Sequence, residues 1–190
     1  MKAFGFLSFG HYGHGRGPGD PDARQALQDA VEIAVGADEI GVNGAYWRVH
    51  HFARQAASPV PLLAAAGART ERIEVGTGVI DMRYENPLHL AEEIAALDLL
   101  TDRRIAIGIS RGSPEQARRG WESFGYTGGD DERGIDVAHA HTAQFLDAVR
   151  GVPQADLDTS NGMAPGASAR LRIEPHVPDV DRRLWWGAGS

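Results

Sequence analysis

Residues suited to holding a ligand stand where two short apolar runs end, in the middle of the chain. The runs fall within residues 73–81 and 104–110, and the residues at their ends are Gly76, Thr77, Gly78, Val79, Ser110 and Arg111. Short runs rich in Ile and Val and bounded by turn residues are typical of buried strands. In α/β folds, ligands bind at the carboxyl ends of parallel strands, so these residues are candidates for a binding site.

Arg111, at the end of the second run, carries a guanidinium whose planar fork of N–H donors can bind an anionic group. Ser113 and Pro114 follow it in a pattern that predicts the start of a helix, and Gln116 completes a capping box with Ser113. The N-terminus of such a helix would bring the positive end of a dipole to a phosphate. The alternative is that Arg111 pairs with a neighbouring carboxylate.

Histidines offer a second kind of chemistry. His50 and His51 follow a third apolar run, and since neighbouring residues of a strand point to opposite faces, only one can face a ligand. A neutral imidazole at such a place could act as a base, and the spacing alone does not say which of the two histidines occupies it. His11 and His14 lie in a Gly-rich loop without a third ligand, so we predict no metal site. A metal-dependent hydrolase built on the four histidines is a further alternative, but it lacks carboxylates at a suitable spacing.

The elements that must position these residues alternate between apolar runs and amphipathic stretches. Strands are expected at residues 2–9, 44–49, 73–81, 104–110 and 183–187. Four helices are each expected to open with a capping residue followed by proline, at Asp20-Pro21, Ser58-Pro59, Asn86-Pro87 and Ser113-Pro114. A fifth helix is expected at residues 135–150, followed by an irregular insertion at 151–170. Strand–helix–strand units of this kind predict a parallel sheet.

The repeated unit favours the α/β class and a (β/α)8 TIM barrel. Such a barrel typically needs about 250 residues, whereas this chain has 190 residues. We therefore expect a single domain over residues 1–190 that forms the N-terminal part of a barrel, with about the first five strands present. A complete, smaller α/β domain that dimerises through its open edge is the alternative.

Charge and composition argue against several classes of protein. The net charge of −7 argues against nucleic acid and anionic membranes as partners. The absence of cysteine from the sequence excludes disulfides and thiolate chemistry. No apolar run approaches the roughly 20 residues that a membrane helix needs, and the first residues hold no credible cleavage site of a signal peptide. We therefore expect a cytoplasmic protein.

Short motifs in the order of one known family run along residues 1–150 and return in the last strand. They are WRVHHF at 47–52, ASPVPLLAA at 57–65, RTERI at 69–73, GTGV at 76–79, NP at 86–87, AEE at 91–93, LDLL at 97–100, RIAIGISRG at 104–112 and WWGAGS at 185–190. On these motifs the chain resembles the bacterial-luciferase-like flavin-dependent oxidoreductases. Family members are full (β/α)8 barrels, so the resemblance also implies that this chain corresponds to the N-terminal portion.

The resemblance implies a flavin at the carboxyl edge of the sheet. Gly78–Val79 would form a non-proline cis peptide against the flavin ring, and Arg111 would bind the phosphate. The other expected cofactor contacts are Thr77, Ser110, Gly189 and Ser190. His50 would act as the catalytic base. The expected cofactor is FMN, with a deazaflavin coenzyme as the alternative.

The activity that the resemblance implies is that of an FMN-dependent monooxygenase, which activates oxygen to oxidise a small organic substrate. A flavin reductase is the expected partner, and a homo- or heterodimer is the expected assembly. One alternative is a non-catalytic flavin-binding protein, a subunit-like protein or an inactive fragment. The other, within the same class, is a deazaflavin-dependent oxidoreductase that transfers hydride.

The chain departs from the family at two places. Val49 stands where luciferases have a glutamate before the histidine pair, and Ala140 stands where the family offers a second phosphate-binding arginine. Arg133, His139 or His141 would have to replace that arginine, or the phosphate would bind more weakly.

Overall fold

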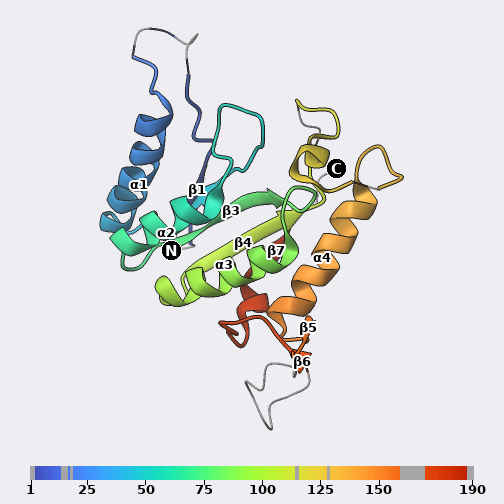
Figure 1. Ribbon diagram of the computed structural model, residues 1–190. Helices are drawn as coiled ribbons and strands as arrows, with labels where there is room; N and C mark the ends of the chain where they lie inside the picture. Colours follow the sequence, from blue (N-terminus) through green and yellow to red (C-terminus); the bar gives the residue numbers. More distant parts are fainter. Residues whose placement is uncertain are drawn as a thin grey trace.

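Five parallel strands form the central sheet of the part that the computed structural model describes, which is residues 3–13, 17, 19–113, 116–127, 129–158 and 170–187. Their order is β1-β2-β3-β4-β7 (Figure 1). The strands are β1 (Gly5–Ser8), β2 (Gly44–Trp47), β3 (Glu74–Asp81), β4 (Ile105–Ser110) and β7 (Leu184–Trp186). This sheet confirms the predicted parallel arrangement and the predicted fifth strand, and it corresponds to part of a (β/α)8 barrel.

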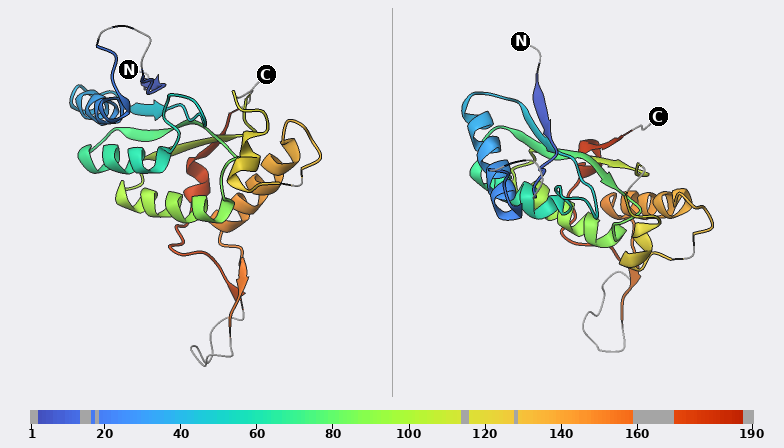
Figure 2. Two further views of the ribbon diagram at one scale, coloured as in Figure 1. Left: turned by 45° about the horizontal axis from the view of Figure 1, so that its top comes forward. Right: turned by 90° about the horizontal axis from the view of Figure 1, so that it is seen from above.

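Four α-helices in the described residues cover one face of the sheet (Figure 2). They are α1 (Ala23–Glu39), α2 (Pro59–Arg69), α3 (Pro87–Leu100) and α4 (Ile135–Val149). Short 3-10 helices, η1 (Gly120–Phe124) and η2 (Val180–Arg183), precede α4 and β7, and a small antiparallel ladder joins β5 (Ala155–Asp156) to β6 (Arg170–Leu171). Within these ranges, no helix has the length and apolarity that crossing a membrane requires.

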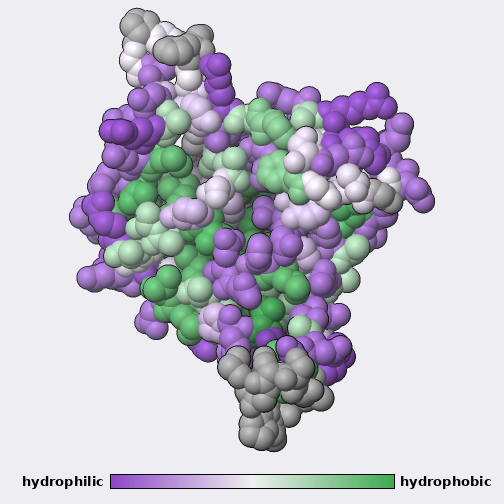
Figure 3. Space-filling model, in the orientation of Figure 1, coloured by the Kyte–Doolittle hydropathy of each residue, from purple (hydrophilic) through white to green (hydrophobic). Residues whose placement is uncertain are grey.

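Side chains alternate along the strands between the helix-covered face and the open face of the sheet. Positions that face the helices carry large, fully buried apolar side chains, namely Trp47, Val75, Ile105 and Ile107. The alternate positions include Leu7, Tyr46 and Glu74 and a set of small residues, namely Gly5, Gly44, Gly76, Ala106 and Gly108. The hydrophobic core therefore lies between sheet and helices. Figure 3 shows apolar residues emerging in strips between the polar outer surfaces of these helices.

Tyr46 occupies the space that glycines leave on the open face. A Cβ atom added at Gly44 would lie 2.6 Å from the Tyr46 ring, and one added at Gly76 would lie 2.0 Å from the Ala106 carbonyl oxygen. The Tyr46 hydroxyl donates a hydrogen bond to Glu74, and burial together with this carboxylate raises the pKa of Tyr46. A side chain at either glycine would therefore displace the aromatic ring or the neighbouring strand.

Asp38 ties the end of α1 to the start of β3. The residue is buried, and its carboxylate accepts backbone N–H groups from Glu71 at 2.8 Å, Arg72 at 3.2 Å and Ile73 at 2.9 Å. Burial opposes ionisation of this carboxyl, but the three N–H donors and the nearby Arg72 guanidinium outweigh it and lower the pKa of Asp38. The register of β3 against α1 is fixed at this point.

Two of the predicted helix starts are confirmed, and a third is displaced by two residues. α2 and α3 begin at Pro59 and Pro87 as predicted, and the Asn86 side chain accepts the first N–H groups of α3. α1 begins two residues later than Asp20-Pro21 predicts. The reason is that Asp22 has the extended backbone of a cap and accepts the Gln25 N–H at 2.8 Å.

The prediction of a helix beginning at Ser113-Pro114 is wrong. Residues 116–119 form bends and turns, and the next helical segment is η1. A helix that begins here would use the Ser113 carbonyl as its first acceptor, but this oxygen accepts a hydrogen bond from the Arg83 guanidinium at 2.8 Å. The positive helix end that we expected beside Arg111 is therefore missing from the described part of this loop.

Replacing Asp38 tests the junction of α1 and β3. We expect Asp38→Asn to lower the free energy of unfolding by about 2–3 kcal/mol, because the amide retains one acceptor oxygen for three buried N–H donors. Urea unfolding followed by circular dichroism measures this loss. Glu39→Gln, at the exposed neighbouring position, is the matched control and should change stability by less than about 0.5 kcal/mol. Equal losses in the two variants would contradict the assignment.

Candidate active site

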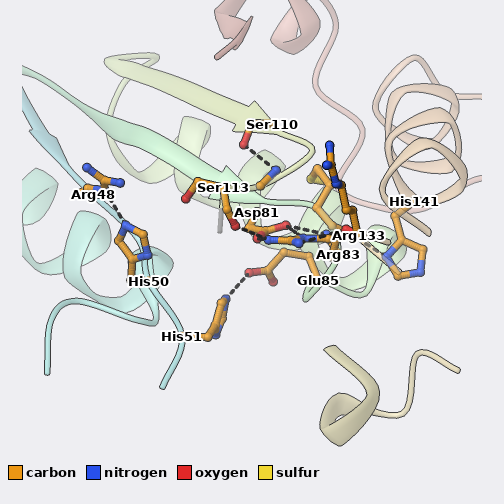
Figure 4. Close-up of polar contacts among 12 residues, drawn as sticks. Arg48, His50, His51, Asp81, Arg83, Glu85, Ser110, Ser113, Arg133 and His141 are labelled. Atoms are coloured by element: carbon orange, nitrogen blue, oxygen red, sulfur yellow. Dashed lines mark hydrogen bonds and ion pairs between the residues drawn. The ribbon is translucent and has the colours of Figure 1, made fainter. Parts of the chain in front are cut away.

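The carboxyl ends of β3 and β4 form the edge at which the candidate residues gather. Asp81 at the end of β3 stands opposite Ser110 at the end of β4, after a shift of register between Thr77 and Ile80. Figure 4 shows Asp81 and Ser110 close to this edge and His50 to one side of it. The end of β2 therefore contributes to the same edge.

The peptide between Gly78 and Val79 is cis, as the resemblance implies. Gly78 lies against Leu7 of β1, whose Cδ1 would meet an added Cβ at 2.9 Å. Val79 lies against Gly187, where an added Cβ would meet the Val79 Cγ1 at 2.8 Å. Segment 78–79 thus contacts β1 through Leu7 and the end of β7 through Gly187. Gly78 itself adds no side chain to the open face.

Thr77 does not belong to this open surface. The residue is fully buried, and its hydroxyl donates a hydrogen bond to the Gly108 carbonyl oxygen at 2.9 Å. The structure therefore places the Thr77 side chain within the sheet, where it stabilises the pairing of β3 with β4.

Ser110 and Arg111 shape the loop after β4. The buried Ser110 hydroxyl accepts the Gly112 N–H at 3.0 Å, and Gly112 has a positive φ of 86°, which glycine adopts without strain. Arg111 is half-buried, and within the described ranges its guanidinium has no hydrogen-bond or ion-pair partner. The predicted alternative, in which Arg111 pairs with a neighbouring carboxylate, is therefore not seen among these residues.

A buried ion pair between Asp81 and Arg83 lies beneath this loop. Asp81 is 3% exposed and Arg83 is 6% exposed, and the Arg83 Nε–H donates to Asp81 Oδ1 at 2.9 Å beside a second contact from Nη2 to Oδ2. An added Cβ at Gly112 would lie 2.2 Å from Asp81 Oδ2, so the loop after β4 passes directly over the pair. This geometry is a two-pronged arginine–carboxylate contact.

The same guanidinium joins two further segments to the edge. Its Nη2 donates to the Ser113 carbonyl oxygen at 2.8 Å and its Nη1 donates to the Arg133 carbonyl oxygen at 3.0 Å (Figure 4). Its cationic carbon also lies 4.8 Å from the centre of the Trp121 ring. Arg83 therefore contacts the loop after β4, the segment that precedes α4, and η1.

Asp81 and Arg83 are not among the residues predicted from the sequence. The signal that points to them is two opposite charges separated by one position at a strand end, and exposed turns carry the same pattern. Their burial depends on residues 30 and 50 positions further along the chain. Pattern and spacing alone do not reveal such a contact.

His50 and His51 point in different directions, as predicted for neighbouring residues (Figure 4). The His50 Nε2 accepts a hydrogen bond from the Arg48 Nε–H, so the neutral ring carries its proton on Nδ1. Burial, and then the positive charge of Arg48, lower the pKa of His50 below its usual value near 6.5. The ring is therefore neutral at pH 7.

His51 faces away from the open side, toward α2 and α3. The ring is buried and stacks on Tyr84, with ring centres 4.3 Å apart, and its Nε2 lies 3.8 Å from a Glu85 carboxylate oxygen. Burial, followed by the charges of Glu93 and Asp81, raises the pKa of Glu85 to about 7. Burial also lowers the pKa of His51. Burial thus favours the neutral form of both Glu85 and His51.

The three residues considered as replacements for the missing phosphate-binding arginine lie in and before α4, in different surroundings. The His141 Nδ1 donates to the Met82 carbonyl oxygen at 2.8 Å, and the His141 ring packs on Tyr126. His139 is exposed, and the Arg133 side chain is exposed while its carbonyl is held by Arg83. The structure therefore uses His141 to fasten α4 to the end of β3.

The remaining predicted residues divide between two cases. Gly189, Ser190 and His14 lie outside the described residues. His11 lies inside them and stacks on Phe9, with ring centres 5.3 Å apart. Over the ranges that can be searched, no group of three or more His, Cys, Asp or Glu side chains could hold a metal ion.

A parallel sheet covered by helices on one face, with small residues on the other and polar residues at its carboxyl edge, is the architecture of (β/α) barrel proteins. Residues 1–190 match the family model of the luciferase-like monooxygenases. The chain belongs to that family.

Three curated relatives are similar over part of this chain. Limonene 1,2-monooxygenase of Rhodococcus erythropolis is 32% identical over 57% of this chain and 29% of its own length. The oxygenase component of the flavin-dependent trigonelline monooxygenase of Acinetobacter baylyi is 29% identical over 47% of this chain and 26% of its own. The F420-dependent glucose-6-phosphate dehydrogenase of Nocardia farcinica is 34% identical over 45% of this chain and 27% of its own length.

Solved structures share the fold. The oxygenating constituent of 3,6-diketocamphane monooxygenase from a Pseudomonas putida plasmid, in complex with FMN, aligns with a TM-score of 0.66 and 21% identity, over 83% of this chain and 41% of that one. The monooxygenase RslO1 of Streptomyces bottropensis aligns with a TM-score of 0.64 and 23% identity, over 90% of this chain and 47% of that one. This chain thus spans less than half of either structure, and the match covers less than a third of each curated relative.

Breaking the Asp81–Arg83 pair tests its structural role. We expect Asp81→Asn to lower the free energy of unfolding by about 3–5 kcal/mol, because it leaves the Arg83 charge buried without its partner. Urea unfolding at pH 7 measures the change. The double variant Asp81→Asn with Arg83→Met removes the stranded charge and should be less destabilised than the two single changes added together. Strict additivity would show that the two side chains act independently.

The raised pKa of Glu85 gives stability a dependence on pH. The carboxyl ionises near pH 4.5 when unfolded and near 7 when folded, so the unfolded state binds fewer protons and stability falls as pH rises from 4.5 to 7. Glu85→Gln removes this group. We expect its gain over the parent chain to grow from almost nothing at pH 4 to as much as about 3 kcal/mol at pH 8. Urea unfolding across this range checks it, and a constant difference would contradict the assignment.

Proposed function

We propose that this chain provides the flavin-binding edge of a flavin-dependent monooxygenase that oxidises a small organic substrate. The observation that carries the proposal is the arrangement at the carboxyl edge, within a chain of the luciferase-like monooxygenase family. There the cis Gly78–Val79 peptide in β3 and the half-buried Arg111 after β4 belong to two paired strands, and the Arg111 guanidinium has no partner in the described structure. The names of the relatives support oxidation as the reaction.

The residues present fit a flavin on two counts. Segment 78–79 is partly exposed, and Gly78 has no side chain that would obstruct a planar ring. Arg111 offers an unpaired planar cation to a phosphate, and the Ser110 hydroxyl turns the loop through the Gly112 N–H. We therefore assign Gly78, Val79, Ser110 and Arg111 to the cofactor.

The first turn of α4 is less suited to a second phosphate contact. Asp131 accepts the Ile135 N–H at 2.8 Å, and Asp136 accepts the Val137 N–H at 2.9 Å, so carboxylates already occupy these donors. The guanidinium of Arg111 is therefore the cation that we assign to the phosphate. Glycine 189 and Ser190, which the resemblance implies as contacts, remain predictions.

His50 is the residue that we assign to proton transfer. Its neutral ring holds a proton on Nδ1, while Nε2 is engaged by the Arg48 guanidinium. In this arrangement the ring can give a proton from Nδ1, and it can accept one at Nε2 after Arg48 moves away. A bound reduced flavin would supply the electrons for oxygen activation, and the ring of His50 would exchange protons beside it.

We propose FMN as the cofactor and a flavin reductase as the source of its reduced form. One relative is described as the oxygenase component of a flavin-dependent monooxygenase, which supports a separate reductase. A relative of comparable identity is F420-dependent, so a deazaflavin coenzyme is the second candidate. Binding of each cofactor to the same chain separates the two.

Titration of the chain with FMN, riboflavin and F420 tests this assignment. We expect FMN fluorescence to be quenched on binding, and Arg111→Ala to weaken FMN about 10–100-fold with riboflavin unchanged, because a charge-assisted contact contributes about 1.5–3 kcal/mol. Arg118→Ala, at a solvent-exposed arginine, is the matched control and should bind FMN as the parent does. Equal weakening of FMN and riboflavin would overturn the role of Arg111, and tighter binding of F420 would overturn FMN.

A further inference from the structure

A cavity of about 430 Å³ lies between α2, α3 and η1, on the helix side of the sheet. The loop after β2 contributes His51, the loop after β3 contributes Glu85, and α3 contributes Glu93. Phe124 and Tyr126 close it from η1 and the segment that follows. The cavity is separated from the candidate flavin edge by the loop after β3, and nothing in the flavin assignment uses these groups.

Two hydrogen-bonding groups in this cavity are left facing each other. The His51 ring is more than nine-tenths buried, and its Nε2 has no hydrogen-bond partner in the described structure. The nearest charged atom is a Glu85 carboxylate oxygen at 3.8 Å, which is too far for a hydrogen bond (Figure 4). A donor placed beside both groups could bond to the carboxylate and, in the Nδ1–H tautomer of His51, to the Nε2 lone pair.

The charges and rings of the cavity select a cation. Its ionisable lining consists of two carboxylates, Glu85 and Glu93, and of histidines, with no lysine or arginine among the described lining residues. Aromatic rings of Tyr84, Phe124 and Tyr126 complete the wall, and aromatic faces attract cations electrostatically. The combination of carboxylates, a histidine acceptor and aromatic faces suits a cation that carries both N–H donors and an apolar part.

We propose that this cavity binds a primary ammonium group, which donates hydrogen bonds to the Glu85 carboxylate and to His51 and lies against the aromatic wall. The positive charge compensates the burial of Glu85. An alkyl chain attached to the ammonium group extends along the apolar wall formed by Pro59, Val60 and Leu90. The ligand class is therefore a small alkylamine in its protonated form.

Isothermal titration of the chain with propylammonium chloride at pH 8 and constant ionic strength tests the proposal. Propylammonium should bind at one site, and 1-propanol, with the same chain and no charge, should bind at least tenfold more weakly. Tetramethylammonium, which has a charge but no N–H donor, should also bind at least tenfold more weakly. Absence of propylammonium binding, or equal binding of tetramethylammonium, overturns the proposal.

Variants locate the site. Glu85→Gln should weaken propylammonium at least tenfold, and Glu93→Gln should weaken it several-fold. Glu92→Gln, the exposed neighbour of Glu93 that does not line the cavity, is the control and should leave the affinity unchanged. Circular dichroism checks that each variant is folded. If Glu85→Gln does not fold, Glu93→Gln is the variant that tests the proposal. Affinity that stays unchanged in both cavity variants overturns the proposal.

The dependence of propylammonium affinity on pH provides an independent test. The ionised carboxylate is the binding form, so affinity should fall about tenfold between pH 8 and pH 6, as the carboxyl with a pKa of about 7 takes up its proton. The titratable groups that face Glu85 are Asp81, Glu93, His51, His89, Tyr84 and Tyr126. Glu85→Gln should abolish this dependence. A pH-independent affinity in the parent chain overturns the role of Glu85.

Discussion

The constraint on which the rest of the structure depends is that the sheet is packed on one face only. Large branched and aromatic side chains point to the helices and are removed from water, whereas many of the alternate positions carry glycine or alanine, with Tyr46 lying across two of these glycines. Burial of the apolar face supplies the driving force for folding. The other face carries no helix in the described structure, and the side chains of Leu7, Tyr46 and Trp185 lie against its glycines.

The carboxyl edge is organised by an arginine that is distant in sequence from the segments it holds. Arg83 is neutralised by Asp81, and its remaining N–H groups bind carbonyl oxygens of Ser113 and Arg133. Carbonyl groups in loops are costly to bury without partners. A single guanidinium, that of Arg83, provides hydrogen bonds for two loops at once, whereas Arg111 in the loop after β4 has no partner among the described residues.

Local chemistry explains what could be predicted from the sequence. Asn86-Pro87 and Ser58-Pro59 begin helices because capping and the fixed φ of proline act within a few residues. The five strands follow from short apolar runs, and the cis peptide at Gly78–Val79 follows from resemblance to a family. The helix expected at Ser113 failed because a residue 30 positions away captures its carbonyl. The Asp81–Arg83 pair and the cavity of Glu85 and His51 escaped prediction for the same reason, since both form only when distant loops meet.

The glycine floor of the open face has a consequence for how such proteins diversify. Tyr46 and the adjacent strand leave no room for a side chain at Gly44 or Gly76, so these positions have almost no freedom to vary. Sequence changes are accommodated more readily in the loops after the strands, where insertions and exchanges leave the core packing intact. The sheet is thus the part of this chain that tolerates least change, and the loops at its carboxyl edge are the part in which variation disturbs the packing least.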